Sequence, residues 1–262
     1  MDADGLLPLA TEIAREAGAL ARRRREEGVR IAATKSALAD IVTDADREVE
    51  QLIRARLAQA RPGDGFLGEE SGAERGTSGV TWVVDPIDGT VNYAYGIPHY
   101  AVSIAAVTGE PTPEAWTAEA GVVYTPVVGE LFHATRGGGA WLGSQRLAVS
   151  TAADAGALLA TGFGYDPATH AGDLERVRRV MPLARDLRRA GAASLDLAYV
   201  AAARLDGYFE RGLWPWDHAA GALLVTEAGG VVTGAPDGRP GREMTIAAGA
   251  DLAARLSSAI YR

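Results

Sequence analysis

The 262-residue chain contains 47% hydrophobic and 23% charged residues, no cysteine, and a formal net charge of −8 at pH 7. The absence of cysteine excludes disulfide bonds, thiolate zinc sites, iron–sulfur clusters and a cysteine nucleophile, so any metal ion must be bound by oxygen or imidazole. The acidic balance disfavours direct contact with nucleic acid, and no apolar run approaches the roughly 20 residues of a membrane span.

Length and the N-terminal residues lead to expectations about organisation and location. The chain is long enough for one globular domain over residues 1–262, built of two tightly packed halves, about 1–149 and 150–262. No repeat, low-complexity tract or linker divides them. The first four residues are acidic and lack the basic and apolar segments of a secretory signal, which predicts a cytoplasmic protein.

Two helices and several short strands are predicted in the first half. Apolar residues at helical spacing predict a helix over residues 6–27, which ends before Gly28. Residues 31–40 are polar and are expected to form a loop. Thr43 and Asp46 have the spacing of a capping box, which opens a second helix running through Leu57. Apolar runs bounded by turn residues predict mostly antiparallel strands over residues 66–68, 81–84, 101–107, 115–124 and 130–134.

Strands and helices alternate after residue 150. Such alternation predicts a layered α/β arrangement for the second half. The predicted strands cover residues 158–161, 186–189, 207–210 and 245–248. The predicted helices cover residues 173–181, 194–204 and 216–228, with one more at the C-terminal end.

Carboxylates follow two of the predicted buried strands. Glu69 comes directly after one short apolar run, and Asp85 and Asp88 follow the next, with Ile87 between them. An unpaired buried charge loses its hydration, and a hard divalent cation such as Mg²⁺ is a suitable partner because it takes oxygen ligands. Asp85, Asp88 and the Ile87 carbonyl place three oxygens within four residues, and we expect a tight turn to point them at one site.

An anion-binding turn is predicted next to these carboxylates. Gly89 and Thr90 lead into a helical turn whose free N–H groups can receive a phosphate, and glycine lets the backbone approach the anion. Taken alone, Asp88-Gly89 is a common turn pair, and Asp217, at the start of a predicted helix, is a common helix cap. The combination of all these residues favours an active site.

Taken together, the motifs resemble the inositol monophosphatase family, which belongs to the lithium-sensitive, metal-dependent phosphatases. The resemblance covers nearly the whole chain, and segments near residues 95–98, 161–165 and 189–193 are similar to the bacterial inositol-1-monophosphatase branch. It implies an α/β (α+β) fold, a layered αβαβα sandwich with a mostly antiparallel N-terminal sheet half and an α/β C-terminal half. It also implies a homodimer. The motifs are Gly-Glu-Glu-Ser at 68–71, Asp-Pro-Ile-Asp-Gly-Thr at 85–90 and Trp-Asp at 216–217.

The resemblance also implies a cofactor of two or three Mg²⁺ ions. By position, Glu69, Asp85 and the Ile87 carbonyl would hold a first ion. Asp85, Asp88 and Asp217 would hold a second, and a weaker third ion would lie near Glu69.

Catalytic and substrate-binding roles are implied by position as well. Thr90 and Asp46 would orient and help deprotonate the attacking water, with Glu69 beside them, although Asp46 has an alternative role as a helix cap. Lys35 matches a mobile-loop lysine of the family, the alternative being a solvated lysine. The implied substrate-binding residues are Asp88, Gly89, Thr90, Ala193, Glu210 and Asp217.

Several residues are expected to differ from the family pattern or to be structural. Tyr165 and Trp214 stand where a serine and a histidine are found in the animal enzymes, which leaves the identity of the polyol open. We expect all four histidines to be structural, and Trp82, Phe132 and Trp216 to lie in the core.

The implied activity is Mg²⁺-dependent hydrolysis of myo-inositol monophosphate to inositol and phosphate by a metal-activated water. The alternatives are a phosphatase of the same fold acting on histidinol phosphate, fructose 1,6-bisphosphate or a 3′-phosphonucleotide, and a non-enzymatic partner of the transcription machinery, as some bacterial relatives are. An aspartyl-phosphate mechanism needs two aspartates two residues apart. Asp85 and Asp88 are three apart, so their spacing does not fit this mechanism.

Overall fold

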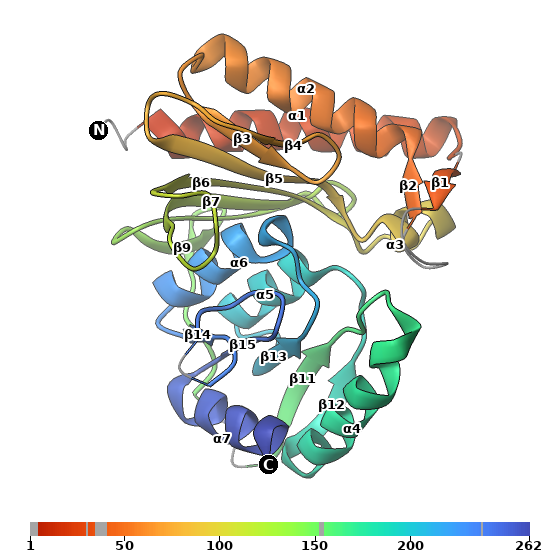
Figure 1. Cartoon of the computed structure of the whole chain (residues 1–262), viewed down its shortest axis with the longest axis vertical. Helices are drawn as coiled ribbons and strands as arrows, with labels where there is room; N and C mark the ends of the chain where they lie inside the picture. Colours follow the sequence, from red (N-terminus) through yellow and green to blue (C-terminus); the bar gives the residue numbers. More distant parts are fainter. Residues whose placement is uncertain (1–4, 30, 35–40, 152–154, 237) are drawn as a thin grey trace.

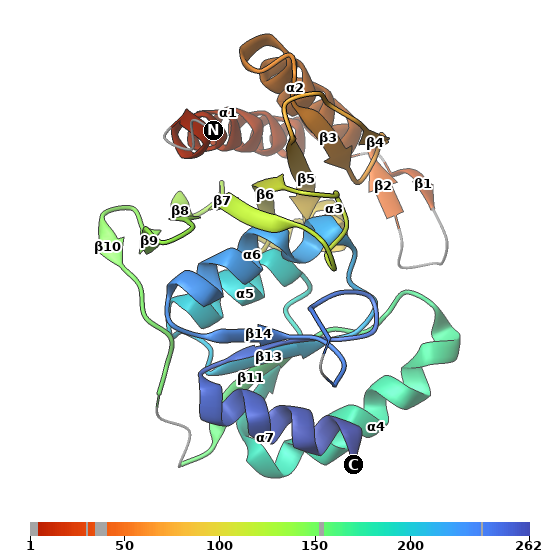
Figure 2. The same cartoon turned by 60° about the vertical axis from the view of Figure 1, so that its left-hand side comes forward.

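The chain folds into five stacked layers, which alternate between helices and sheets (Figure 1). The computed structural model describes residues 5–29, 31–34, 41–151, 155–236 and 238–262. An outer helix pair covers an eight-stranded sheet, a second helix pair lies between that sheet and a five-stranded sheet, and a third pair covers the far side, as Figure 2 also shows. This is the αβαβα sandwich that the sequence predicts.

The first helix pair consists of α1 (Leu6–Glu27) and α2 (Asp44–Ala60). The apolar face of α1 is largely buried, and Gly28 ends the helix with φ of 108°. The predicted capping box opens α2, because the Thr43 N–H donates to Asp46 at 2.8 Å and Asp46 N–H points back at the Thr43 hydroxyl. Both helices therefore begin and end close to where the sequence predicts.

The eight-stranded sheet has the order β10-β9-β8-β7-β6-β5-β3-β4. All neighbouring strands are antiparallel except β3 and β5, which are parallel. The sheet is therefore mostly antiparallel, as the sequence predicts, although β4, β9 and β10 were not predicted. Its strands are β3 (Gly65–Gly68), β4 (Gly72–Glu74), β5 (Val80–Asp88), β6 (Ala101–Thr108), β7 (Thr117–Thr125), β8 (Glu130–Thr135), β9 (Gly139–Leu142) and β10 (Gln145–Arg146).

The five-stranded sheet has the order β12-β11-β13-β15-β14. β12, β11 and β13 are parallel, whereas β15 is antiparallel to both of its neighbours. Its strands are β11 (Ala157–Thr161), β12 (Ala184–Arg188), β13 (Gly207–Glu210), β14 (Val231–Thr233) and β15 (Thr245–Ala248).

The middle helices, α5 (Ala193–Ala201) and α6 (Pro215–Glu227), pack against both sheets. Small residues allow this close packing: a Cβ on Gly221 would lie 2.6 Å from Leu197, and one on Gly121 would lie 3.1 Å from Ala220. One apolar cluster contains side chains from both halves, including Phe132 and Leu195. On this shared core we propose that residues 1–262 form a single domain.

The remaining elements cover the outer surfaces. The prediction of a loop over residues 31–40 is partly wrong, because residues 31–34 form a strand that pairs antiparallel with residues 41–43. Extended pairing of this kind leaves no periodic signal in so short a segment. None of the described helices has the length and apolarity needed to cross a bilayer. The elements are β1 (Ile31–Thr34), β2 (Ile41–Thr43), α3 (Thr90–Tyr95), η2 (Pro167–Thr169), α4 (His170–Val180), η3 (Met181–Leu183) and α7 (Ala250–Tyr261).

Candidate active site

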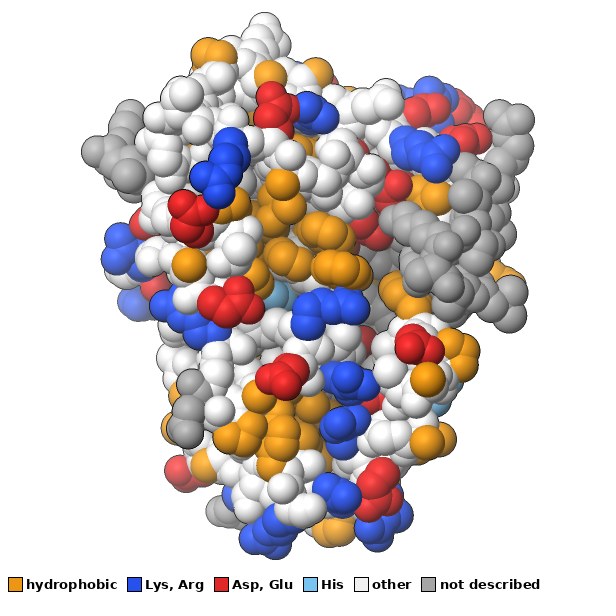
Figure 3. Space-filling view, in the orientation of Figure 1, with side chains coloured by type: hydrophobic (Ala, Val, Ile, Leu, Met, Phe, Trp, Pro, Cys, Tyr) orange, Lys and Arg blue, Asp and Glu red, His pale blue; other side chains and the backbone are white. Residues whose placement is uncertain are grey.

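A cavity of about 720 Å³ is lined by residues of both halves. Acidic side chains (red) lie in the recess at the boundary between the upper and lower parts of the face in Figure 3. The cavity lining contains the four acidic residues predicted from the sequence, which come from three separate segments of the chain, and the anion-binding turn beside them. The lining residues predicted from the sequence are Glu69, Asp85, Ile87, Asp88, Gly89, Thr90 and Asp217.

Parallel pairing of β3 and β5 brings Glu69 next to Asp85. Gly68, the last residue of β3, is aligned with Val84, and the Glu69 N–H donates to the Val84 carbonyl at 3.3 Å. Glu69, which follows Gly68, and Asp85, which follows Val84, therefore lie at the same end of the sheet. Two carboxylates that are 16 positions apart meet because their strands are neighbours.

A bulge, not a tight turn, brings Asp85 and Asp88 to the same cavity. The expectation of a turn was wrong: β5 continues to Asp88, with a register shift against β6 between these two residues. Side chains three positions apart in a regular strand point to opposite faces, and an extra residue in the bulge corrects this. The Asp85 carboxylate accepts from the Ile87 N–H at 3.0 Å, which holds the bulge in shape.

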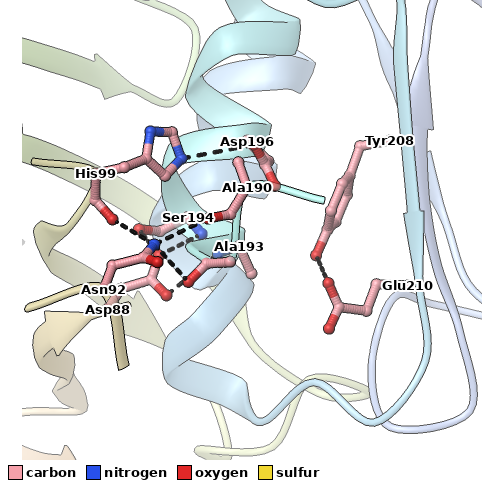
Figure 4. Close-up of polar contacts among 10 residues, drawn as sticks. Asp88, Asn92, His99, Ala190, Ala193, Ser194, Asp196, Tyr208 and Glu210 are labelled. Carbon is pink, nitrogen blue, oxygen red and sulfur yellow. Dashed lines mark hydrogen bonds and ion pairs between the residues drawn. The ribbon is translucent and has the colours of Figure 1, made fainter. Parts of the chain in front are cut away.

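Asp88 binds the start of α5 in the opposite half. One carboxylate oxygen accepts from the Ala193 N–H at 3.2 Å, and the other accepts from the Ser194 N–H at 2.7 Å and hydroxyl at 2.5 Å (Figure 4). A carboxylate at a helix N-terminus satisfies N–H groups that have no partner within the helix. The Ala193 N–H is thereby engaged, so a polyol contact at this position would use another backbone group.

Asp217 lies in the first turn of α6. It is not the N-cap: the helix is capped at Trp214, whose N–H donates to the Asp217 carboxylate at 2.7 Å. Pro215 occupies the first helical position, where its missing N–H costs nothing. The carboxylate is therefore held by the backbone of its own helix start and lines the cavity.

Thr90 begins α3 directly after Gly89, which has a left-handed φ of 92°. A Cβ on Gly89 would lie 3.0 Å from the His99 carbonyl. Glycine therefore suits this turn because it adopts a positive φ readily and because it leaves room for that carbonyl. The Thr90 hydroxyl lies 3.2 Å from Asp46 Oδ1 and 3.1 Å from the Ile87 carbonyl. Asp46 caps α2 with Oδ2, so its capping contact and its Thr90 contact use different oxygens.

The acidic end of the cavity is electrostatically unfavourable without a cation. Burial raises the pKa of Asp85 well above its usual value, and repulsion from Glu69, Asp88 and Asp217 raises it further. Burial also raises the pKa of Asp217, as does repulsion from Asp88 and Glu69. Burial raises the pKa of Asp46 to about 6, although the Thr43 hydroxyl opposes the shift. A bound cation would reverse these shifts.

The donor set suits Mg²⁺ in its chemistry, because every candidate is a carboxylate or carbonyl oxygen. Within the described residues, no three acidic or histidine side chains are already placed to hold one ion together. The ligand roles implied by the sequence therefore stay predictions.

Glu210 lies at a smaller adjoining cavity that also reaches Asp88, Ala193 and Asp217. The Tyr208 hydroxyl donates to Glu210 Oε2 at 2.6 Å (Figure 4). A Cβ on Gly162 would lie about 2.0 Å from the Glu210 carboxylate, so glycine makes room for it. Burial raises the pKa of Glu210 to about 7, and the Tyr208 hydrogen bond opposes that shift.

The remaining predictions concern Lys35, three aromatic residues and the histidines. Lys35 lies outside the described residues. Trp82 and Phe132 are buried in the core, but Trp216 is only partly buried and its side chain also lines the cavity. The described lining of the cavity contains no histidine, and His218 is buried beside Trp116.

Sequence reasoning missed Ser194, Tyr208, Arg211 and Arg242. The first two bind predicted site residues, and the two arginines line the cavity. Nothing in the sequence marks them, because they belong to no motif and their roles depend on which strand and loop lie next to each other.

Comparisons with known proteins identify the same family as the sequence motifs do. Residues 2–261 match the inositol monophosphatase family. Inositol-1-monophosphatase SuhB of Mycobacterium tuberculosis is 42% identical, with 98% of this chain and 93% of the relative covered. Nus factor SuhB of Escherichia coli is 44% identical over 87% of this chain and 84% of its own. The crystal structure of extragenic suppressor protein suhB from Bartonella henselae superimposes with a TM-score of 0.89 and 38% identity, covering 97% of this chain and 98% of that one.

Three kinds of observation therefore agree: the motifs, the five-layer fold, and similarity over nearly the whole chain. The chain belongs to the inositol monophosphatase family and is a phosphatase of that superfamily.

Proposed function

We propose that this protein is a Mg²⁺-dependent phosphomonoesterase whose leading substrate is myo-inositol monophosphate. The observation that carries the proposal is the convergence of Glu69, Asp85, Asp88 and Asp217 on one cavity beside the Gly89 turn. These carboxylates come from two halves of the chain, Asp85 and Asp88 buried and Glu69 and Asp217 half-buried, and a fold that needed only stability would not gather like charges in this way. A cation-dependent reaction on an anion would account for this cluster of carboxylates.

The proposed ligands are assigned by position. Glu69, Asp85 and the Ile87 carbonyl would hold one ion, and Asp85, Asp88 and Asp217 a second, with a third near Glu69. Mg²⁺ held there would lower the pKa of a coordinated water and offset the charge of the reacting phosphate.

The chain's own residues position the reacting groups. Gly89 and Thr90 line the cavity, and the reacting phosphate would bind at this turn. Asp46, with a pKa of about 6, is mostly deprotonated at neutral pH and can accept a proton through the Thr90 hydroxyl 3.2 Å away. Thr90 and Asp46 would thus orient the attacking water and receive its proton.

The leaving group would be bound on the other side of the cavity. Glu210 and Asp217 carry carboxylate oxygens that can accept hydrogen bonds from vicinal hydroxyls, and both line the smaller adjoining cavity. Inositol monophosphate supplies such hydroxyls on every ring carbon except the one that carries the phosphate. The homodimer implied by the sequence stays a prediction.

A panel of phosphoesters tests the proposal. Purified protein is assayed with inositol 1-phosphate, histidinol phosphate, fructose 1,6-bisphosphate and a 3′-phosphonucleotide, in Mg²⁺ and in EDTA, with and without lithium. We expect hydrolysis only with Mg²⁺, inhibition by lithium, and the highest kcat/KM for inositol 1-phosphate. A rival substrate with a far higher kcat/KM would overturn the substrate assignment, and full activity in EDTA would overturn the metal assignment.

A second candidate function is supported by the E. coli relative, which is named a Nus factor. We propose that this chain also contacts the transcription machinery through protein partners. Affinity capture of transcription components by the wild-type protein and by Asp88→Asn tests this. Capture by both proteins, with hydrolysis lost in the variant, would support a separate role, and no capture by either would reject it.

A further inference from the structure

One side chain holds the loop that leads into α5, residues 189–192, which we call the entry loop. Asn92, in the first turn of α3, is only 8% exposed. Its side-chain nitrogen donates to the His99 carbonyl and to the Ala190 carbonyl at 2.8 Å each, and it lies 3.4 Å from the Gly191 carbonyl (Figure 4). The amide has two N–H groups, so both shorter bonds form at once. Asn92 therefore joins the first half of the chain to the second.

Asp88 and Asn92 hold the same stretch of the second half in complementary ways. Asp88 accepts from the Ala193 and Ser194 N–H groups, which come directly after the entry loop. Asn92, four residues later in the first half, donates to carbonyls of the entry loop itself. The start of α5 is therefore fixed from both sides by one short segment, residues 88–92.

The Gly89 turn lies between these two contacts and packs against the entry loop. A Cβ on Gly89 would lie 3.2 Å from the Gly191 carbonyl oxygen and 3.2 Å from the Ala192 Cβ. The two backbones are therefore in close contact at this point. The turn also has support within its own helix, because the Tyr93 N–H donates to the Gly89 carbonyl at 2.9 Å.

The entry loop forms part of the smaller cavity. Residues 189, 191 and 192 line that cavity together with Ala193 and Glu210. Under the proposed function, the polyol lies in this cavity and the reacting phosphate lies at the Gly89 turn. The distance between polyol and phosphate sites therefore depends on how the entry loop is held against the first half.

Asn92 differs from Asp88 because it is neutral. Asp88 is a proposed metal ligand, so its carboxylate would be shared between α5 and a bound cation. The Asn92 amide and the carbonyls that it binds carry no net charge and do not titrate. Asn92 can therefore hold the entry loop equally well with and without Mg²⁺.

We infer that Asn92 is a positioning residue, which keeps the polyol-binding wall in place against the phosphate-binding turn and so aligns the ester bond for cleavage. This inference rests on the proposed function. Asn92 is absent from the described linings of both cavities, so it acts through the entry loop and not by touching the substrate. A displacement of about 1 Å in such a wall can lower the rate by about 100-fold.

Kinetics with two phosphoesters test this role. Asn92→Ala should lower kcat for inositol 1-phosphate by about tenfold to 100-fold, with a smaller rise in KM, because the polyol still binds but holds its phosphate out of line. Hydrolysis of p-nitrophenyl phosphate should change little, because its leaving group offers the polyol wall no hydroxyl. An equal loss of kcat on both esters, or a loss confined to KM, would overturn the positioning role.

Tyr93→Phe is the matched control. The Tyr93 hydroxyl donates to the Ala21 carbonyl at 2.8 Å, and the ring is completely buried. The variant therefore removes a bond of the same kind from the neighbouring residue, but one that ties α3 to α1. It should leave the ratio of the two kcat values unchanged. If Tyr93→Phe changed this ratio as much as Asn92→Ala, the effect would belong to α3 as a whole and the inference would be wrong.

Hydrogen exchange tests the same role without turnover. Backbone N–H groups over residues 189–194 should exchange several-fold faster in Asn92→Ala than in the wild type, both in EDTA and in Mg²⁺, and Tyr93→Phe should leave them unchanged. Unchanged exchange in Asn92→Ala would overturn the inference. If no phosphoester were hydrolysed but this exchange depended on Asn92, the proposed function would fail and the holding of the entry loop by Asn92 would stand.

Nuclear magnetic resonance tests the bonds in the wild-type protein, even if Asn92→Ala does not fold. Asn92 is the single asparagine of the sequence, so protein labelled with nitrogen-15 at asparagine alone gives one pair of side-chain signals. We expect both side-chain protons to exchange slowly with water, in EDTA and in Mg²⁺ alike. Fast exchange of the pair, or protection that appears only with Mg²⁺, would overturn the inference.

Discussion

Ser194 donates both its backbone N–H and its hydroxyl to one oxygen of Asp88, at 2.7 and 2.5 Å, across 106 positions of sequence. The two residues belong to opposite halves: Asp88 ends β5 and Ser194 lies in the first turn of α5. Ser194 is completely buried. This pair therefore fixes a proposed metal ligand and at the same time ties the second half to the first.

Ser194→Ala should weaken Mg²⁺ binding. The Ser194 hydrogen bonds lower the pKa of Asp88 against the effect of burial, so loss of the hydroxyl makes the charged carboxylate less favourable. We expect the Mg²⁺ concentration for half-maximal activity to rise several-fold, and the free energy of unfolding to fall by about 1.5–3 kcal/mol. Magnesium titrations and denaturant unfolding measure the two effects. In an Asp88→Asn background, the same substitution should no longer change the magnesium dependence.

Asp85→Asn should lose activity and gain stability in the metal-free protein. Turnover should fall by roughly 100-fold or more, because several kcal/mol of metal-dependent charge stabilisation are lost. Burial and repulsion raise the pKa of Asp85, so its charge destabilises the folded state at pH 8. We expect a higher Tm than the wild type in EDTA, and little further rise with Mg²⁺. Asp251→Asn, at an exposed position of α7, is the control. A lower Tm in EDTA would contradict the proposed charge repulsion.

The pH dependence of stability should differ with and without Mg²⁺. Burial raises the pKa of Asp46 from 3.8 to about 6 and that of Glu210 from 4.5 to about 7, so the folded protein binds these protons more tightly than the unfolded chain. Their stabilising contribution is therefore complete below about pH 4 and is lost as the pH rises through 6 to 7. We expect the metal-free Tm to fall across this range.

Magnesium should oppose that loss. Because its ligands must be deprotonated, the rise in Tm on adding Mg²⁺ should be larger at pH 8 than at pH 5. Thermal unfolding at both pH values, in EDTA and in Mg²⁺, measures this difference. An equal rise at the two pH values would argue against carboxylate ligands with raised pKa values.

Tyr208→Phe should affect polyol binding and not the chemistry of phosphate release. The Tyr208 hydroxyl holds Glu210 at 2.6 Å, and the ring itself is completely buried and would be retained. We expect a several-fold higher KM for inositol 1-phosphate with little change in kcat. Gly162→Ala should have a larger effect in the same direction, because its Cβ would lie about 2.0 Å from the Glu210 carboxylate.

A substrate without hydroxyls provides the control for both variants. Hydrolysis of p-nitrophenyl phosphate should be unchanged by Tyr208→Phe, because that ester offers Glu210 no hydroxyl. Equal losses on both substrates would mean that Tyr208 supports the site as a whole.

Local patterns were sufficient for the helices and the longer strands. The helix α1 and the capping box of α2 follow from apolar spacing and from Thr43 with Asp46, since these signals involve residues within one or two turns. The short strands β4, β9, β10 and β14 were missed, because two to four residues carry no periodicity and their extended form depends on a neighbouring strand. The predicted tight turn at Asp85 was wrong for a similar reason, because a bulge exists only relative to its partner strand β6.

By itself, the sequence determined the family, the layered fold and the residue types at the acidic site, because these depend on motifs and on local apolar periodicity. Only the tertiary structure decided which groups surround those residues: Ser194 on Asp88, Tyr208 on Glu210, and Arg242 on Trp214. The physical reason is that hydrogen bonds and stacking act over a few ångströms, and the residues that come within that range are chosen by how sheets, helices and loops pack, not by their order along the chain.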